Sequence, residues 1–303
     1  MQSDRKARRQ RKPQAHHTPK KEQREVITEI ADADSGEETG FQTTYTPGLF
    51  EEGWLIDSLR PFYNRGLITD VLARVKGGKE ANVYRCAANP ETGMTLMAAK
   101  VYRPRMFRNL RNDKMYQEGR QLLTADGKHG KPDERMIRAV GKKTAYGQQV
   151  AHTSWLMHEF TTLERLYEAG AAVPQAISSA ENALLMGYCG DENMAAPALS
   201  EVSLDEDEAK PLFIETIRNI EIMLQNGMIH GDLSAYNILY WEGEVKIIDF
   251  PQAVNPDVNP YGEAIFQRDV LRVCQYFEKY GIKADAEKLA REMWSRNITL
   301  EDE

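Results

Sequence analysis

The sequence predicts an α+β protein with two lobes, in which an antiparallel sheet precedes a mainly helical part. Two patterns support this class. Residues 72–86 and 94–102, separated by the turn signal NPETG, predict three successive antiparallel strands with glycines in the first connection. After residue 211, apolar residues recur with helical spacing. The chain has 303 residues, of which 41% are hydrophobic and 28% charged, and this allows one large or two modest cores.

We expect residues 1–45 to be a disordered tail that is first basic and then acidic. Residues 1–24 hold nine Lys or Arg against two carboxylates, a net charge of +7, while the whole chain carries -7. Such a segment has too little apolar surface to fold on its own. It is either an arm for RNA, including a ribosomal partner, or a solvated tail.

The remaining chain divides into residues 46–186, with a helix and the sheet, and residues 187–303, with most of the helices. An amphipathic pattern over 49–62 predicts a helix interrupted at Pro61. Residues 124–134 and the acidic run 203–211 are expected to be loops. Further helices are predicted over residues 154–170, 211–227, 264–281 and 285–294, and a strand is predicted over 184–190.

The sequence contains neither an apolar run long enough for a membrane helix nor an apolar segment behind the basic start. A cytoplasmic location is therefore expected. The three cysteines, Cys86, Cys189 and Cys274, lie far apart and lack metal-ligand spacing, so we interpret them as buried free thiols.

The segment IHGDLSAYNILYWEGEVKIIDF, residues 229–250, places two carboxylates and an amide around a short hairpin. The apolar residues flank a Glu-Gly turn, so Asn237 and Asp249 should lie side by side at the hairpin's open end. Amide and carboxylate oxygens are ligands that Mg²⁺ prefers. Asp232 lies five residues before Asn237, where it can accept a proton or orient a nucleophile. Each residue alone would more often be a turn former, but the three together favour a cation-and-phosphate site.

Three further charged residues lie at positions that should be buried. Lys100 ends an apolar strand, and Glu159 lies within the apolar stripe of a helix. Two such charges are costly unless they meet, which predicts a Lys-Glu pair at the nucleotide; unrelated exposed side chains are the alternative. Asp269 lies on an apolar helix face and should accept backbone N–H bonds, while His230 is expected to hold backbone.

The loop KGGKEANVY between two predicted strands can approach phosphate closely through its glycines. Gly78 and Lys79 are its candidate nucleotide-binding residues. The motif is weak by itself, because Lys76 and Ala81 replace the other glycines of G-x-G-x-x-G, and a plain hairpin turn is the alternative.

Together these segments resemble the protein-kinase set of glycine-rich loop, strand lysine, helix glutamate, catalytic loop and metal-binding aspartate. In detail, GGKEANVY, HGDLSAYNILY and IIDFPQAV resemble motifs of the RIO family of atypical serine/threonine protein kinases. The resemblance runs from about residue 67 to 280. It implies a two-lobed protein-kinase-like fold that lacks the activation loop and the peptide-binding region.

The resemblance also implies roles for these residues. Lys100 would hold the nucleotide phosphates and pair with Glu159, while Asp232 would be the catalytic aspartate. Asn237 and Asp249 would bind Mg²⁺, with Mn²⁺ as an alternative ion. In some family members the aspartate matching Asp249 is transiently phosphorylated, so that ATP hydrolysis could matter as much as phosphorylation of a protein substrate. The backbone at Gly187 and Cys189 would contact adenine, although many relatives carry a larger residue at position 187.

Two other functions stay open. A small-molecule phosphotransferase of the aminoglycoside-kinase type shares H-G-D-x(4)-N and I-D-F, but the KEANVY loop disfavours it. The third hypothesis is a nucleotide-responsive factor that binds ribosomal precursors through the basic segment. Only nineteen residues separate Asp249 from Asp269, with no A-P-E motif between them, so ordinary peptide recognition is not expected.

Overall fold

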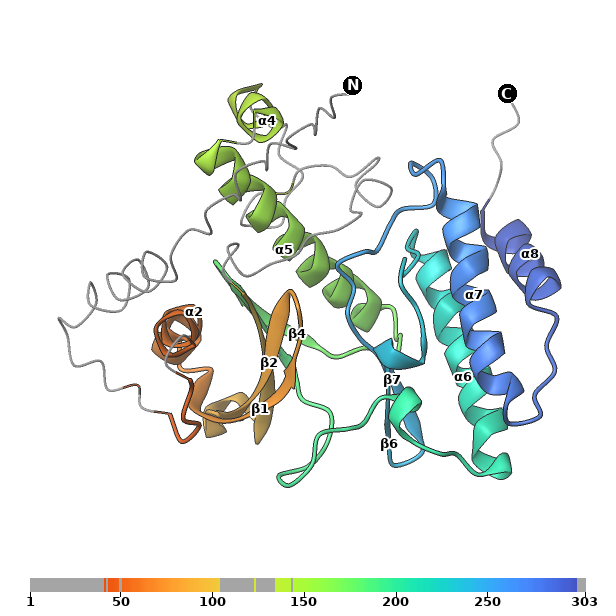
Figure 1. The fold of residues 1–303 in the computed structure, drawn as a ribbon, viewed down its shortest axis with the longest axis horizontal. Helices are drawn as coiled ribbons and strands as arrows, with labels where there is room; N and C mark the ends of the chain where they lie inside the picture. Colours follow the sequence, from red (N-terminus) through yellow and green to blue (C-terminus); the bar gives the residue numbers. More distant parts are fainter. Residues whose placement is uncertain are drawn as a thin grey trace, which may run out of the picture.

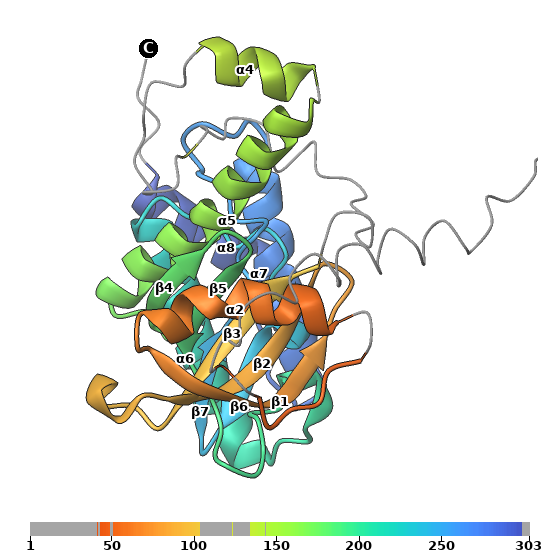
Figure 2. The same cartoon turned by 90° about the vertical axis from the view of Figure 1, so that its left-hand side faces the viewer.

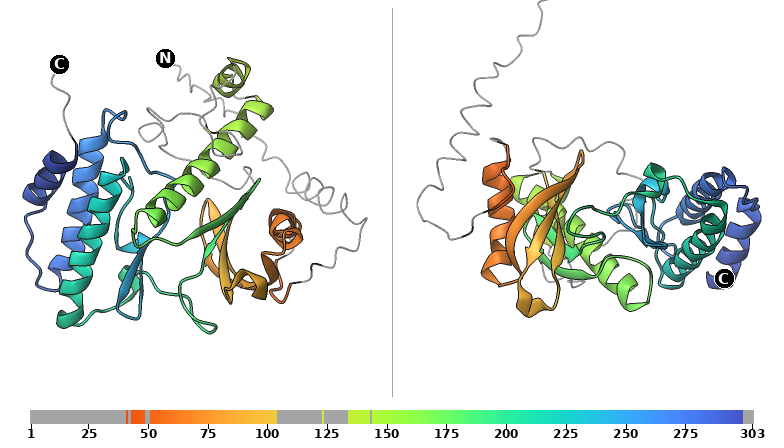
Figure 3. Two further views of the ribbon diagram at one scale, coloured as in Figure 1. Left: turned by 180° about the vertical axis from the view of Figure 1, so that it is seen from behind. Right: turned by 90° about the horizontal axis from the view of Figure 1, so that it is seen from below.

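The computed structural model describes residues 41, 43–48, 51–103, 123, 134–142 and 144–298. These residues form two lobes, one built on a five-stranded sheet and one built mainly from helices beside a two-stranded hairpin (Figures 1 and 3). The predicted α+β class and the two-lobed arrangement are confirmed.

The N-terminal lobe contains an antiparallel sheet with the strand order β1-β2-β3-β5-β4. The first three strands and the strand at 184–190 were predicted, but β4 was not, because its short Ala-Ile-Ser-Ser-Ala run has no strong strand signal. The strands are β1 (Ile68–Gly77), β2 (Ala81–Ala88), β3 (Leu96–Tyr102), β4 (Ala176–Ala180) and β5 (Ala183–Gly187).

Alternate residues of β3 enter two different cores, because successive side chains of a strand point to opposite faces. Met97, Ala99 and Val101 pack in a cluster beneath helix α2 (Glu52–Asn64), which covers one face of the sheet (Figure 2). Ala98 and Tyr102 join the larger cluster, which continues into the C-terminal lobe. Lys100 shares their face and therefore points toward the space between the lobes.

Helix α2 corrects one prediction, since it continues through Pro61 to Asn64. A proline inside a helix removes one backbone hydrogen bond. The next residue, Phe62, is fully buried against the sheet together with Leu55 and Leu59. We attribute the continuation to this burial, which offsets the lost bond.

Helix α5 (Ala145–Glu168) begins earlier than the predicted residue 154. Thr144 caps it, because its hydroxyl accepts the Gly147 N–H at 3.1 Å. A preceding helix, α4 (Glu134–Gly141), was not predicted. Of the loop expected at 124–134, residues 124–133 lie outside the described residues.

The C-terminal lobe packs three helices side by side, away from the sheet (Figure 3). The first helix starts inside the acidic run that was predicted to be a loop, where the Glu208 carboxylate accepts the Asp205 N–H at 3.3 Å. In the described ranges, no helix has the length and hydropathy that crossing a membrane requires. The elements are α6 (Glu206–Gln225), β6 (Ile238–Trp241), β7 (Glu244–Ile247), α7 (Gly262–Glu278) and α8 (Ala286–Asn297).

The cysteine prediction is confirmed for Cys86 and Cys274, which are buried free thiols, and is wrong for Cys189. Cys189 is only partly buried because it lines the cleft between the lobes. The predicted basic arm and most of the tail lie outside the described residues. Within the predicted tail, Phe41 is buried and its ring centre lies 4.5 Å from that of Tyr63, so the folded part includes this residue.

Candidate nucleotide and metal site

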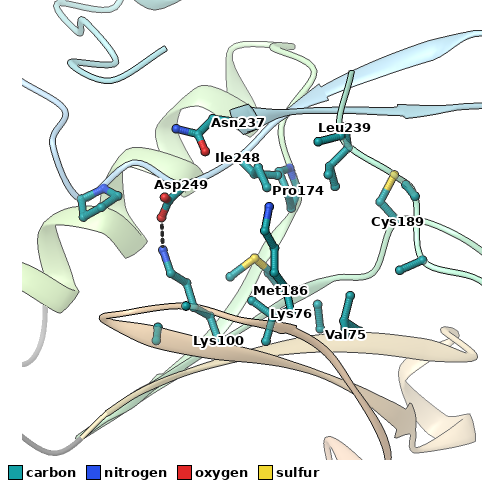
Figure 4. Close-up of a pocket in the computed structure, with 18 of the residues that line it drawn as sticks. Val75, Lys76, Lys100, Pro174, Met186, Cys189, Asn237, Leu239, Ile248 and Asp249 are labelled. Carbon is teal, nitrogen blue, oxygen red and sulfur yellow. Dashed lines mark hydrogen bonds and ion pairs between the residues drawn. The ribbon is translucent and has the colours of Figure 1, made fainter. Parts of the chain in front are cut away.

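The β6–β7 hairpin brings Asn237 and Asp249 to one end, as the sequence predicts. β6 pairs with β7 in an antiparallel register, and the Ile248 N–H donates to the Asn237 carbonyl at 2.9 Å. The Asn237 side-chain nitrogen donates to the Asp232 carbonyl at 2.9 Å. The side-chain oxygen of Asn237 faces the cleft on the side of Asp249 (Figure 4).

Asp249 adopts a backbone conformation that few residues tolerate. Its φ angle is 73°, in the left-handed region, where Asp is one of the less unfavourable residues. Non-glycine residues held in this region are enriched at functional sites. Asp249 lies two residues after the end of β7, and its carboxylate points into the cleft, where it meets Lys100 (Figure 4).

Lys100 makes two short ion pairs, one of which joins the two lobes. Its Nζ lies 2.5 Å from Glu159 Oε1 on α5 and 2.6 Å from Asp249 Oδ1. Glu159 is 1% exposed, so the predicted Lys-Glu pair is confirmed as a buried contact. The Tyr102 hydroxyl donates to the second Glu159 oxygen, and the Phe250 N–H donates to the first at 3.3 Å. The buried carboxylate is therefore hydrogen-bonded on both oxygens, as burial requires.

These contacts shift the pKa values of Lys100 and Asp249 in opposite directions. Burial would lower the pKa of Lys100, but the Asp249 and Glu159 carboxylates raise it well above its usual range. Burial would raise the pKa of Asp249, but the Lys100 ammonium outweighs burial and lowers it. Both groups are therefore charged at neutral pH.

Asp232 lies on the solvent-facing side of residues 230–237, the segment that resembles the catalytic loop of protein kinases and is called the catalytic loop below. Its side chain is 57% exposed and lines the cleft, and its Oδ1 accepts a hydrogen bond from Arg272 at 2.8 Å. A group that exchanges protons with a substrate hydroxyl needs such access.

Two buried side chains hold the catalytic loop, as predicted for both. Nε2 of His230 lies 3.0 Å from the Ile248 carbonyl, and its Nδ1 accepts the Asp232 N–H at 3.2 Å. Asp269 on α7 accepts the N–H groups of Gly231 and Leu233 at 2.8 and 3.3 Å. Burial raises the pKa of Asp269, although His230, Arg268 and the Gly231 N–H act against it.

The cleft between the lobes has a volume of about 700 Å³ and contains every predicted nucleotide-binding residue. Gly78 and Lys79 line it from the β1–β2 loop, Gly187 lines it from the end of β5, and Cys189 lines it from the connector that follows. A volume of this size is in the range of small-ligand sites. The lining also includes Met186 and Leu239, which make the connector side apolar (Figure 4).

Sequence reasoning assigned no role to Lys76, Tyr102 or Arg272. Lys76 stands where a glycine would occur in the loop motif, yet its side chain extends into the cleft (Figure 4). Its charge also contributes to lowering the pKa of Asp249. The sequence shows that Lys76 replaces a glycine of the motif. The contacts of Tyr102 with Glu159 and of Arg272 with Asp232 span 57 and 40 positions, so no local pattern predicts them.

The donor set at the hairpin end fits a divalent cation. A carboxylate that is charged at neutral pH and an amide oxygen directed at the same space are hard ligands, and Mg²⁺ typically takes one or two such protein groups beside phosphate and water. Among the described residues, no group of three or more His, Cys, Asp and Glu could enclose a metal. A cation held by these two groups would take its other ligands from phosphate and water.

Comparison with known proteins agrees with this geometry. The family model of the RIO domain matches residues 82–289, more than half of the chain. The chain belongs to the RIO family. The RIO match includes the strand lysine, the helix glutamate, the catalytic loop and the aspartate at 249, and it begins just after Gly78 and Lys79.

Curated RIO relatives include proteins from animals and archaea. Human serine/threonine-protein kinase RIO1 is 30% identical over 220 residues, which cover 72% of this chain and 35% of that protein. The RIO-type serine/threonine-protein kinase Rio2 of Methanocaldococcus jannaschii is 29% identical and covers 82% of both chains. This chain therefore spans about a third of the human relative and most of the archaeal one.

The solved structure of the Rio2 kinase from Chaetomium thermophilum confirms the fold. It has a TM-score of 0.55 and 22% sequence identity, and the match covers 89% of this chain and 76% of that chain. A structure described as the Rio2 kinase-ADP/Mg²⁺-phosphoaspartate complex from the same organism gives a TM-score of 0.54 at 20% identity, covering 88% and 74%.

Proposed function

We propose that this RIO-family protein is an ATP- and Mg²⁺-dependent phosphotransferase that acts as a serine/threonine protein kinase or as an ATPase. One observation carries the proposal: Lys100 of the sheet lobe lies within 2.6 Å of Asp249 of the helical lobe, in a cleft that also holds Asp232 and Asn237. A phosphate-binding lysine, a metal-binding carboxylate and a proton acceptor are the parts that phosphoryl transfer requires.

The two lobes supply different parts of the reaction. Lys100, oriented by Glu159, would bind the nucleotide phosphates, and the loop at Gly78 and Lys79 would cover them. Mg²⁺ or Mn²⁺, held by Asn237 and Asp249, would neutralise charge on the transferred phosphoryl group. The apolar connector side at Gly187 and Cys189 would receive adenine.

Asp232 would orient the attacking hydroxyl and accept its proton. The exposure of this carboxylate suits a substrate that approaches from solvent. Asp249 is a second acceptor, because 44% of its side chain is exposed and its charge makes it nucleophilic. The related Rio2 kinase has a solved ADP/Mg²⁺-phosphoaspartate complex, and we propose that Asp249 forms an aspartyl-phosphate of this kind, whose cleavage by water would complete ATP hydrolysis without a protein acceptor.

Labelled ATP tests the proposal directly. Wild-type protein with Mg²⁺ should release phosphate or become labelled, and Asp232→Asn should lower the rate by on the order of 10² to 10⁴, since it removes the proton acceptor. Asp57→Asn, on the exposed surface of α2, is the matched control and should retain the wild-type rate. Mass spectrometry would separate phosphorylated Ser or Thr from a hydroxylamine-sensitive aspartyl-phosphate on Asp249.

Equal rates in wild-type protein and Asp232→Asn would refute the proposed activity. Stimulation of ATP turnover by hydroxylated metabolites would instead favour a small-molecule phosphotransferase. An RNA or ribosomal partner and a cytoplasmic location stay predictions, and the basic segment on which the first depends lies outside the described residues.

A further inference from the structure

We propose that Arg272 is a positioning residue that holds the Asp232 carboxylate in the orientation that proton transfer requires. The inference rests on the proposed function, since it concerns the group that would accept the substrate proton. Arg272 Nη1 lies 2.8 Å from Asp232 Oδ1, although the two residues are 40 positions apart in the sequence.

One face of α7 contacts three successive residues of the catalytic loop. Arg268 donates to the Gly231 carbonyl, and Asp269 accepts the N–H groups of Gly231 and Leu233. Arg272 lies one helical turn beyond Arg268 and reaches the side chain of Asp232. Thus α7 fixes the backbone of the loop through Arg268 and Asp269, and fixes the carboxylate through Arg272.

The short connection from the hairpin to α7 makes this contact possible. β7 ends at Ile247 and α7 begins at Gly262, with no helix or strand in the described segment between them. The helix therefore packs directly against the catalytic loop, and its positive side chain lies where a longer activation segment would otherwise intervene. The loop itself offers only neutral side chains between Asp232 and Asn237, namely Leu233, Ser234, Ala235 and Tyr236.

The Arg272–Asp232 pair contributes little to folding stability. The side chains are 39% and 57% exposed, and ion pairs at such positions are weakened by water and salt. The pair can still fix the orientation of the Asp232 side chain, because a carboxylate on an exposed loop samples several rotamers unless a contact restrains it. Among the described residues, Arg272 is the only side chain bonded to the Asp232 carboxylate, and it engages Oδ1 alone. The second oxygen stays available for a substrate hydroxyl.

Four variants separate this role from a structural one. Arg272→Gln should lower kcat by roughly 10-fold to 10²-fold, the range expected for a misplaced group, while KM for ATP changes less than twofold. Arg272→Lys should recover part of the loss, because it keeps the charge but loses the planar fork. Arg218→Gln, which breaks an exposed Arg-Glu pair on α6, should retain the wild-type rate. In Asp232→Asn protein, adding Arg272→Gln should change the residual rate less than twofold.

Crystal structures of wild-type protein and Arg272→Gln give a readout independent of turnover. The Asp232 carboxylate should be ordered in the first and displaced or disordered in the second, with the loop backbone unchanged. An unmoved Asp232 carboxylate would overturn the inference, as would additive losses in the double variant. Absence of turnover in wild-type protein would refute the proposed function instead, and the two structures would still decide the role of Arg272.

Discussion

At the scale of single residues, the ion pairs around Lys100 carry the cost of burying charge. Moving a charge from water into the protein interior costs several kcal/mol. The attraction between the partners offsets this cost only when both are well hydrogen-bonded. Glu159 meets that condition, with Lys100, Tyr102 and the Phe250 N–H as donors. Asp249 is 44% exposed, so its carboxylate can exchange Lys100 for a cation at lower cost, which leaves Lys100 free to pair with phosphate.

The loss of folding stability at low pH should depend partly on Asp249. Because its folded-state pKa is lowered, its charge stabilises the fold above the ordinary carboxyl pKa of about 3.9, and this contribution is lost as pH falls through the folded value. At pH 7, Asp249→Asn should lower Tm by about 2–4 °C, the shift expected for about 1 kcal/mol in a large domain. Thermal unfolding should show a constant difference in Tm from pH 7 to about pH 4 and a shrinking difference below that pH. A difference that stays constant below pH 4 would contradict the assigned ion pair.

At the scale of elements, α7 and the catalytic loop form one unit. The loop turns sharply at Gly231, whose φ is 85°. The Gly231 N–H donates a hydrogen bond to the buried Asp269 carboxylate at 2.8 Å. On the other side, Gly231 approaches Gln252 so closely that a Cβ would overlap the Gln252 carbonyl oxygen. The loop geometry therefore depends on glycine for both conformation and space.

Two glycines with the same φ separate these requirements. Gly243, in the β6–β7 turn, also has a φ of 85°, but a Cβ there would meet nothing within 4 Å. Gly243→Ala should cost about 1–2 kcal/mol from the left-handed conformation alone. Gly231→Ala should cost more, because backbone must also move, and it should abolish turnover. Equal losses of stability in chemical denaturation would show that the close approach to Gln252 is unimportant.

At the scale of the whole molecule, the cleft joins two lobes that share one continuous core. The larger hydrophobic cluster runs from Ala98 and Tyr102 of the sheet, through Leu163 of α5, to Ile247 and Phe250 beside the candidate metal site. Lys100 crosses the cleft above this core. A nucleotide that contacts both lobes should therefore stabilise the entire fold.

Ligand-induced stabilisation tests this arrangement. A non-hydrolysable ATP analogue with Mg²⁺ at 100 times its Kd should add about 2.7 kcal/mol and raise Tm by several degrees. Lys100→Met should lose most of this shift, because the phosphates lose their cation, while the smaller shift caused by adenosine persists. Lys288→Met, on the exposed surface of α8, should respond like wild-type protein. An undiminished ATP-analogue shift in Lys100→Met would exclude Lys100 as a phosphate ligand.

The amino-acid sequence alone determined the fold class, the β6–β7 hairpin and the grouping of Asp232, Asn237 and Asp249, because these depend on side-chain periodicity and short-range turn chemistry. It also predicted the Lys100–Glu159 pair, since two charges on apolar faces require partners. Helix starts were less predictable: α5 and α6 begin in polar segments whose helical state depends on capping by Thr144 and Glu208.

Only the tertiary structure decided which distant residues complete the site. The pairing of Arg272 with Asp232, the Tyr102 contact to Glu159 and the exposure of Cys189 arise from how α7, β3 and the connector pack against one another. No local pattern encodes these contacts, because each depends on elements that meet only when the two lobes close around their common core. Long-range packing thus selects the partners, while local sequence supplies the reactive groups.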